Sequence, residues 1–239
     1  MNWQYNFCRR VVSRNFYTML KIILITQLFV LASFNSVKNY SHFESADLRL
    51  LYQECGLETI LSFDIFKMAM TGMGKINELQ NKSIITIIDF SKPSTQERFF
   101  VIDLKNKLVL SKSLVAHGKN SGENMADSFS NDSKSLKSCL GFFLTAETYT
   151  GKNGYSLKLD GLEPGINDNA RQRTIVIHGA DYVSASFAQQ HGRLGRSWGC
   201  PVLPTDNLKE IIDKISQGSC LFIYGNDPEY PKASKILNE

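Results

Sequence analysis

Cysteine is scarce in this sequence, with five residues among 239. Small secreted domains that depend on disulfides are much richer in cysteine, so a disulfide scaffold is excluded. The four cysteines after residue 32 are an even number, which leaves two readings open: two bridges, or at least one free thiol. These four are Cys55, Cys139, Cys200 and Cys220.

Metal-ligand spacings are also missing. His117, His178 and His191 are each followed by glycine, but the chain has no His-Glu-x-x-His pattern and no Cys-x-x-Cys pair. Zinc sites and zinc hydrolases rely on such spacings. We therefore predict no metal site, and we interpret His191 as a solvated residue near a helix end.

No acidic residue occurs in the first 32 positions, and the apolar run at 22–32 is short of the roughly 20 residues that span a bilayer. Basic residues before a short apolar run are typical of a secretory signal, with Val30 and Ala32 at the cleavage site. An uncleaved membrane anchor at 1–32 is the alternative. Either way, we expect export to the periplasm or cell envelope. The basic residues of this segment are Arg9, Arg10, Arg14 and Lys21.

The charge left after this segment gives no basic surplus. The chain holds 27 Lys and Arg against 23 Asp and Glu, and removing the four basic residues of the leader leaves 23 against 23. Nucleic-acid-binding domains usually carry a clear excess of positive charge. We therefore predict no nucleic-acid partner.

Two regions with different patterning follow, and neither contains an internal repeat. Residues 40–80 are predicted to form a helical appendage, because apolar residues recur there at three- and four-residue steps, with a break at Gly56. Residues 84–230 contain short Ile-, Val- and Phe-rich runs between turn signals. The predicted fold class is therefore mainly β (α+β), an antiparallel β-sandwich or barrel. The expected strands lie within 83–90, 98–104, 107–116, 140–147, 155–159, 173–179 and 219–225.

Two helices are expected to interrupt the strands, one within 180–192 and one over 205–216. Thr205 is the predicted cap of the second helix, and Gly218 lies just past its end. The polar, serine-rich segment 118–138 is too long for an ordinary connection. It is either a functional lid or disordered.

The stretch GRLGRSWGCPVLP, residues 192–204, places Cys200 on a glycine-rich loop. A thiol attacks only as its thiolate, so a nucleophilic cysteine needs a nearby base or a positive local field. His178, at the end of the apolar run 174–177, is the candidate base. Arg193 and Arg196 are candidates for the positive field. A buried or bridged thiol is the reading that a lone cysteine would favour.

The neighbours of Cys200 suit a nucleophile. Gly199 has no Cβ, so the backbone can approach a substrate carbonyl and point N–H groups at a developing oxyanion. Pro201 has no N–H and favours an extended conformation of Cys200. The oxyanion donors are therefore predicted among the N–H groups of Trp198, Gly199 and Cys200.

This pattern, with eighteen residues between His178 and the SWGCP segment, resembles the active-site motif of the YkuD-type murein L,D-transpeptidases. It closely matches a branch in which GRSWGCP replaces the commoner form. Residues 135–146 are similar to the family's Thr-Pro-x-Gly-x-Phe strand. The resemblance covers about residues 84–225. It makes residues 84–230 the catalytic domain.

By position, the resemblance makes Cys200 the nucleophile and His178 the base. Gly179 takes the place of a serine whose backbone carbonyl orients the histidine. Ser197 and Gly199 match the family motif directly, and we expect Ser197 to contact substrate.

Two positions depart from the common motif: Trp198 replaces a second histidine, and Val202 replaces Asn or Arg. Trp198 either packs or walls the pocket and desolvates the thiol. His117 is the candidate to stand in for the missing histidine. Arg196 or Arg193 is the candidate to hold a stem-peptide carboxylate, the alternative being two solvated arginines.

The resemblance implies acyl transfer on peptidoglycan stem peptides, without a cofactor. The thiolate would attack the carbonyl of the third stem residue, expel the terminal D-alanine and leave a thioester. An amine of another stem would resolve it to a 3-3 crosslink. The alternatives are an L,D-carboxypeptidase, which uses water, and a non-catalytic wall-binding module.

Overall fold

The computed structural model describes residues 45–239. The predicted signal peptide and Cys8 lie outside this part. Within the described part no helix has both the length and the apolar character needed to cross a membrane. The cysteines of this part are all free thiols, which removes the two-bridge reading; they are Cys55, Cys139, Cys200 and Cys220.

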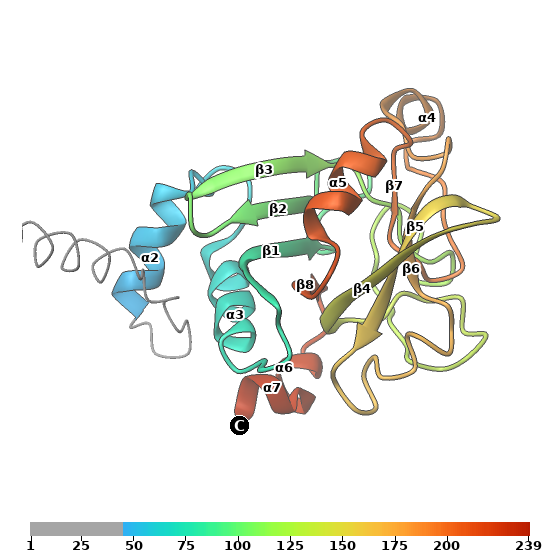
Figure 1. Ribbon diagram of the computed structural model, residues 1–239. Helices are drawn as coiled ribbons and strands as arrows, with labels where there is room; N and C mark the ends of the chain where they lie inside the picture. Colours follow the sequence, from blue (N-terminus) through green and yellow to red (C-terminus); the bar gives the residue numbers. More distant parts are fainter. Residues whose placement is uncertain (1–44) are drawn as a thin grey trace, which may run out of the picture. The chain divides into compact units, whose positions relative to one another are not determined.

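One curved eight-stranded sheet forms the centre of the fold, with strand order β3-β2-β1-β8-β4-β5-β6-β7 (Figure 1). Most neighbours are antiparallel, but β1 pairs parallel to β8 and β6 pairs parallel to β7. The predicted mainly β fold is confirmed, as a mixed rather than purely antiparallel sheet. The strands are β1 (Asn81–Asp89), β2 (Phe99–Asp103), β3 (Leu108–Ser113), β4 (Gly141–Gly151), β5 (Gly154–Gly161), β6 (Val176–Gly179), β7 (Val202–Leu203) and β8 (Ser219–Tyr224).

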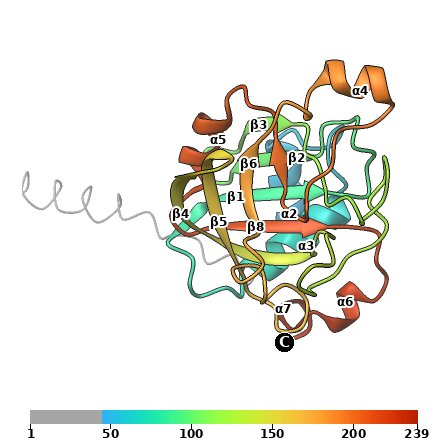
Figure 2. The ribbon, with the colours of Figure 1, turned by 90° about the vertical axis from the view of Figure 1, so that its right-hand side faces the viewer.

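The sheet nearly closes into a barrel. Ala116, just past the edge strand β3, forms an antiparallel bridge with Val202 of the opposite edge strand β7. Its N–H donates to the Val202 carbonyl over 2.8 Å, and the reverse bond measures 3.2 Å. Figure 2 shows β1 and β8 side by side in the middle of this curved sheet. Closure satisfies edge groups that would otherwise be free to pair with another chain.

The predicted helical appendage is part of the same core. Its two helices, α2 (Ser45–Glu54) and α3 (Phe63–Met73), are separated near Gly56, whose φ of 65° lies in the left-handed region. A Cβ added at Gly72 would lie 2.0 Å from the Phe142 ring atom Cζ, so α3 packs closely against β4. Truncating the fully buried Phe66 to alanine should cost about 3–5 kcal/mol.

The remaining helices are short: α4 (Ala185–His191), α5 (Leu208–Ile215), α6 (Tyr230–Ala233) and α7 (Lys235–Asn238). α4 has the Ser184 hydroxyl as its cap, accepting from the Phe187 N–H over 3.2 Å. The prediction for α5 was wrong at its start, because Asn207 with φ of 59° precedes the helix and no side chain caps it. Thr205 contributes only its backbone carbonyl, which accepts from the Leu208 N–H.

The long polar segment 118–138 is packed against the domain. The Ser121 hydroxyl accepts from the Ser138 N–H over 2.9 Å, and the Asn120 amide donates to the Ser135 carbonyl over 2.9 Å. These bonds contradict the disordered reading. The segment instead forms a wall beside the loop that carries Cys200, since Gly118 bridges Ser197.

Candidate active site

The parallel pairing of β6 and β7 brings the two predicted reacting residues into one region. His178 is the register partner of Val202, two residues after Cys200. Two residues before His178, the Val176 N–H lies 3.5 Å from the Cys200 sulfur. Because side chains alternate along a strand, Val176 and His178 point to the same side of β6. A cysteine 22 positions away in sequence therefore lies beside the strand of the histidine.

His178 is oriented by its own chain. Its side chain is 6% exposed, and Nδ1 lies 3.0 Å from the Gly179 carbonyl oxygen. A carbonyl only accepts hydrogen bonds, so Nδ1 carries the proton and Nε2 keeps a free lone pair. Burial lowers the pKa of His178, and the Gly179 carbonyl partly opposes this. The imidazole is thus neutral at pH 7 and able to accept a proton.

Cys200 is a half-buried free thiol. Burial raises its pKa, which the Val176 N–H and the charge of Arg173 partly counteract. Its sulfur also lies 3.5 Å from the Thr174 carbonyl oxygen. Thr174 itself has φ of 57°, a rare conformation for a β-branched residue, and so the predicted strand begins at Val176 rather than at 174. A thiol in this setting needs a base to become a nucleophile.

The loop that carries Cys200 needs a glycine at position 199, directly before the cysteine. Gly199 has φ of 127°, and an added Cβ would lie 2.8 Å from the Lys137 carbonyl oxygen. Its N–H donates to the Ser197 hydroxyl over 3.0 Å, and that hydroxyl donates to the Cys200 carbonyl over 2.7 Å. Ser197 therefore braces the loop, which differs from the predicted substrate contact.

These internal bonds narrow the predicted oxyanion donors. The Gly199 N–H is already bonded to Ser197. By contrast, the backbone N–H groups of Trp198 and Cys200 have no carbonyl acceptor among residues 45–239, and the Cys200 N–H faces its own sulfur. Donors that point at a developing charge must be free of other partners. The donor set is thus reduced to these two N–H groups.

The Trp198 side chain is 76% exposed. A side chain this exposed neither packs in the core nor desolvates the neighbouring thiol, which contradicts both readings of Trp198. The burial of Cys200 comes instead from contacts with two apolar clusters of the core. Tyr182, which packs on the smaller cluster, has its pKa raised by burial and by the charge of Cys200. Sequence reasoning did not find this tyrosine, because a lone Tyr carries no motif.

His117 does not reach the surface, which corrects its predicted role in the pocket. It is completely buried: Nδ1 accepts from the Arg98 guanidinium over 2.8 Å, and Nε2 lies 3.3 Å from the Gly122 carbonyl oxygen. Burial and the Arg98 charge lower its pKa to about 4. The Phe90 ring packs edge-on against it. His117 is a neutral core residue.

Arg193 and Arg196 also differ from their predicted roles. Both pair with Glu123, at 3.0 and 2.6 Å, and Arg196 further donates to the Gly122 carbonyl over 3.1 Å. The two arginines therefore share one carboxylate within the chain. The arginine whose charge acts on Cys200 is Arg173, which the motif did not indicate.

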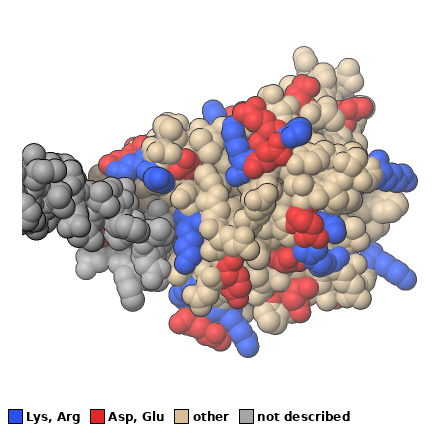
Figure 3. Space-filling view, viewed as in Figure 1, with Lys and Arg blue, Asp and Glu red and all other residues tan. Residues whose placement is uncertain are grey.

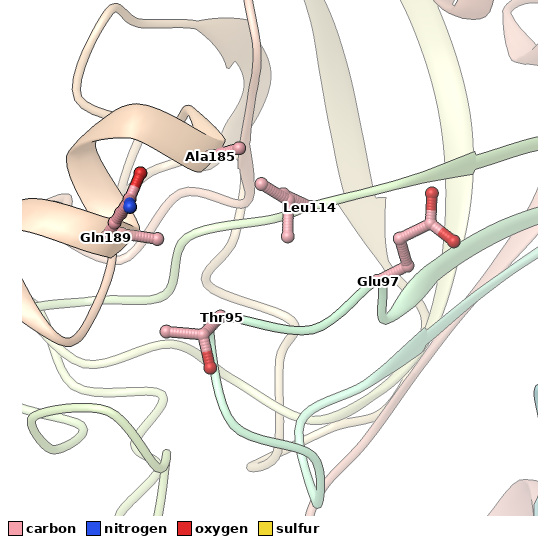
Figure 4. A pocket seen from close by; sticks show the side chains of 6 residues that line it. Thr95, Glu97, Leu114, Ala185 and Gln189 are labelled. Carbon is pink, nitrogen blue, oxygen red and sulfur yellow. The ribbon is translucent and has the colours of Figure 1, made fainter.

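Two cavities of the described surface lie next to this region. A cavity of about 470 Å³ separates α4 from the end of β3 (Figure 4), and a second of about 340 Å³ is lined by residues that follow β6 and β7. Both are lined by Leu114 and Ala185, so they adjoin one another. Neither is lined by Cys200 or His178. The face in Figure 3 shows acidic and basic side chains interspersed.

The fold and this region define a barrel-like β-domain with a strand-end histidine beside a loop cysteine. A family model described as the L,D-transpeptidase catalytic domain matches residues 57–224, well over half of the chain. The chain belongs to the YkuD L,D-transpeptidase catalytic domain family. No curated protein sequence matches it.

Solved structures similar to this chain include three L,D-transpeptidases. The one from Mycobacterium smegmatis is 15% identical, with 60% of this chain and 59% of that chain covered and a TM-score of 0.38. L,D-transpeptidase 1 from Mycobacterium tuberculosis is 16% identical, with 60% of this chain and 62% of that chain covered and a TM-score of 0.32. The L,D-transpeptidase from Stackebrandtia nassauensis is 14% identical, with 77% of this chain and 78% of that chain covered and a TM-score of 0.37. The chain thus spans about three fifths of the length of the first two.

Proposed function

We propose that this protein is an exported cysteine acyltransferase that forms 3-3 crosslinks between peptidoglycan stem peptides. The observation that carries the proposal is the pairing of β6 with β7, which sets Cys200 beside the strand that ends in His178. Membership of the L,D-transpeptidase family supports the same substrate class.

In the proposed reaction His178 Nε2 takes the proton of the Cys200 thiol. The sulfur then attacks the carbonyl of the third stem residue, and the tetrahedral oxyanion binds the free N–H groups of Trp198 and Cys200. Collapse breaks the peptide bond, and the imidazolium returns its proton to the departing D-alanine. An amine of a second stem resolves the thioester and restores the thiol.

No hydrogen bond joins the thiol to the imidazole within residues 45–239, where the sulfur instead contacts Thr174 and Val176. Proton transfer therefore requires rotation about the Cα–Cβ bond of Cys200 or a bridging water. Catalytic hydrogen bonds of this kind commonly tighten only when substrate is bound.

Acylation by imipenem tests the nucleophile, since one solved L,D-transpeptidase is in complex with this carbapenem. Intact-mass analysis of the full chain should show one adduct, absent from Cys200→Ala. The matched control is Cys139→Ala, which removes a buried cysteine of the same core and should keep the adduct. A folded wild type that forms no adduct would favour a wall-binding module over an enzyme.

Incubation with purified stem tetrapeptides then separates the two enzymatic readings. New 3-3 dimers that depend on Cys200 support the crosslinking function. Tripeptides without dimers would assign the protein as an L,D-carboxypeptidase, because water would then be the only acceptor.

A further inference from the structure

Arg173 lies just before β6 and holds the wall segment with its guanidinium. Nη1 donates to the Ser130 carbonyl over 2.6 Å, and Nη2 donates to the Lys137 carbonyl over 2.6 Å and to the Ser135 hydroxyl over 3.2 Å. All these partners are neutral. The guanidinium is therefore fixed in place by three bonds that leave its charge uncompensated.

This fixed charge is in contact with the nucleophile loop. A Cβ built on Gly199 would lie 3.1 Å from Arg173 Nη2, so the guanidinium rests against the α-carbon of the residue before Cys200. The absence of a side chain at Gly199 permits this approach. Arg173 is thus placed by geometry, independently of any titration, next to the reacting cysteine.

Arg173 is also without a carboxylate partner in the described part of the chain. Three other arginines do have one: Arg193 and Arg196 share Glu123, and Arg171, two residues away, pairs with Asp160 and Glu147. The buried Arg98 resembles Arg173 in having only neutral hydrogen-bond partners. Taking a cation partly out of water is costly unless an anion accompanies it. What distinguishes Arg173 from Arg98 is its position next to the Cys200 loop, where a thiolate would provide such an anion.

We propose that Arg173 is the positioning residue which supplies the positive field of the active site, and that this field stabilises the Cys200 thiolate that forms when His178 takes the proton. It replaces Arg193 and Arg196 in that role. The proposal rests on the proposed function only in taking Cys200 as the reacting residue. Arg173 does not touch the sulfur, and it acts through the field across Gly199.

Other titratable groups around the thiol do not supply this field. His178 on β6 is neutral at pH 7, and burial raises the pKa values of Tyr182, which precedes α4, and Cys139, which precedes β4. The Lys137 ammonium is directed to the Ser128 hydroxyl, 2.6 Å away. Among the described residues, Arg173 is the charged group whose effect lowers the pKa of Cys200.

The test is the pH dependence of Cys200 alkylation by iodoacetamide, followed by peptide mass, in the full chain. Arg173→Gln removes the charge but keeps a hydrogen-bonding side chain. Arg173→Lys keeps the charge but loses the planar guanidinium that donates through two nitrogens. We expect Arg173→Gln to raise the apparent thiol pKa and to slow alkylation at pH 7 by about tenfold, as one pKa unit requires. Arg173→Lys should retain most of the wild-type rate.

The matched control is Arg171→Gln, which removes an exposed charge two residues away and should leave the profile unchanged. Equal profiles for Arg173→Gln and the wild type, or equal shifts in Arg173→Gln and Arg173→Lys, would overturn the proposal in favour of a purely structural clamp. If Arg173→Gln does not fold, Arg173→Lys decides alone: a wild-type profile supports the field, and a tenfold loss overturns it. Alkylation needs no peptidoglycan, so a failure to crosslink is distinguishable from a failure of this inference.

Discussion

The regions around His117 and His178 share a His-Gly sequence but have opposite environments. His117 is completely buried and both ring nitrogens face partners, Arg98 and the Gly122 carbonyl. His178 ends a strand, and within residues 45–239 only its Nδ1 has a partner. Burial lowers the pKa of both, so charge alone does not separate them. The free Nε2 leaves His178 able to accept a proton, whereas both ring nitrogens of His117 are engaged inside the fold.

The same contrast extends to the arginines. In the His117 region Arg196 pairs with Glu123, and Arg98 is held in the core by two carbonyls and the His117 ring. Arg173 also has neutral oxygen partners, but it lies beside the free Cys200 thiol. A region that satisfies all its polar groups internally stabilises the fold. The region around Cys200 leaves the His178 Nε2 lone pair free and the Arg173 charge without a carboxylate, so these groups are available to a ligand. The two sides of the loop that carries Cys200 therefore have different polar environments.

The largest difference is expected in acylation. His178→Gln should lower the rate of imipenem acylation by about 10²–10⁴-fold, because the general base is lost. His117→Gln should stay close to the wild-type rate, since that imidazole is remote from solvent. Stopped-flow or quenched mass measurements give both rates. Equal losses of acylation rate in the two variants would contradict the different roles of the two histidines.

A smaller but opposite difference is expected in stability. Replacing His117 by Ala leaves the buried Arg98 without one partner and should cost about 2–4 kcal/mol of unfolding free energy. His178→Ala should cost less, because its ring makes one bond to an adjacent residue. Urea unfolding at pH 7 measures both.

Acid unfolding sharpens the same point. The pKa of His117 is about 4 in the fold, below its ordinary 6.5, so the unfolded chain binds more protons between these values. Wild-type stability should therefore fall as pH drops through this window, by about 3 kcal/mol from His117. This part of the slope should be missing from His117→Gln, and parallel slopes in the two proteins would argue against a buried neutral imidazole.

The smallest effect is expected at Glu123, whose side chain is 72% exposed. Glu123→Gln breaks the pairs with Arg193 and Arg196 but should change stability by less than about 1 kcal/mol and leave acylation unchanged. Glu97→Gln, which breaks an exposed pair with Lys112, is the control. A collapse of acylation in Glu123→Gln alone would return Arg196 to the role that the sequence suggested.

Local pattern was sufficient for most of the strands and for the break at Gly56, because alternating apolar runs and a positive-φ glycine act over a few residues. It was insufficient for β7, where two residues carry no periodicity, and for α6 and α7, which are one turn each. Thr205 failed as a cap for the same reason: a capping residue type is common, and only the backbone conformation at Asn207 decides where the helix begins.

The sequence by itself determined the candidate reacting pair, Cys200 and His178, because a motif fixes residue types and spacing along the chain. It also determined the need for glycine at 199 and the missing donor at Pro201. Only the tertiary structure decided which histidine keeps a free ring nitrogen, which arginines pair with a carboxylate and which N–H groups remain free. Those properties depend on neighbours distant in sequence: Arg98 for His117, Glu123 for Arg196, and the wall segment for Arg173. Spacing along one chain does not encode such partners, because packing of the barrel brings them together.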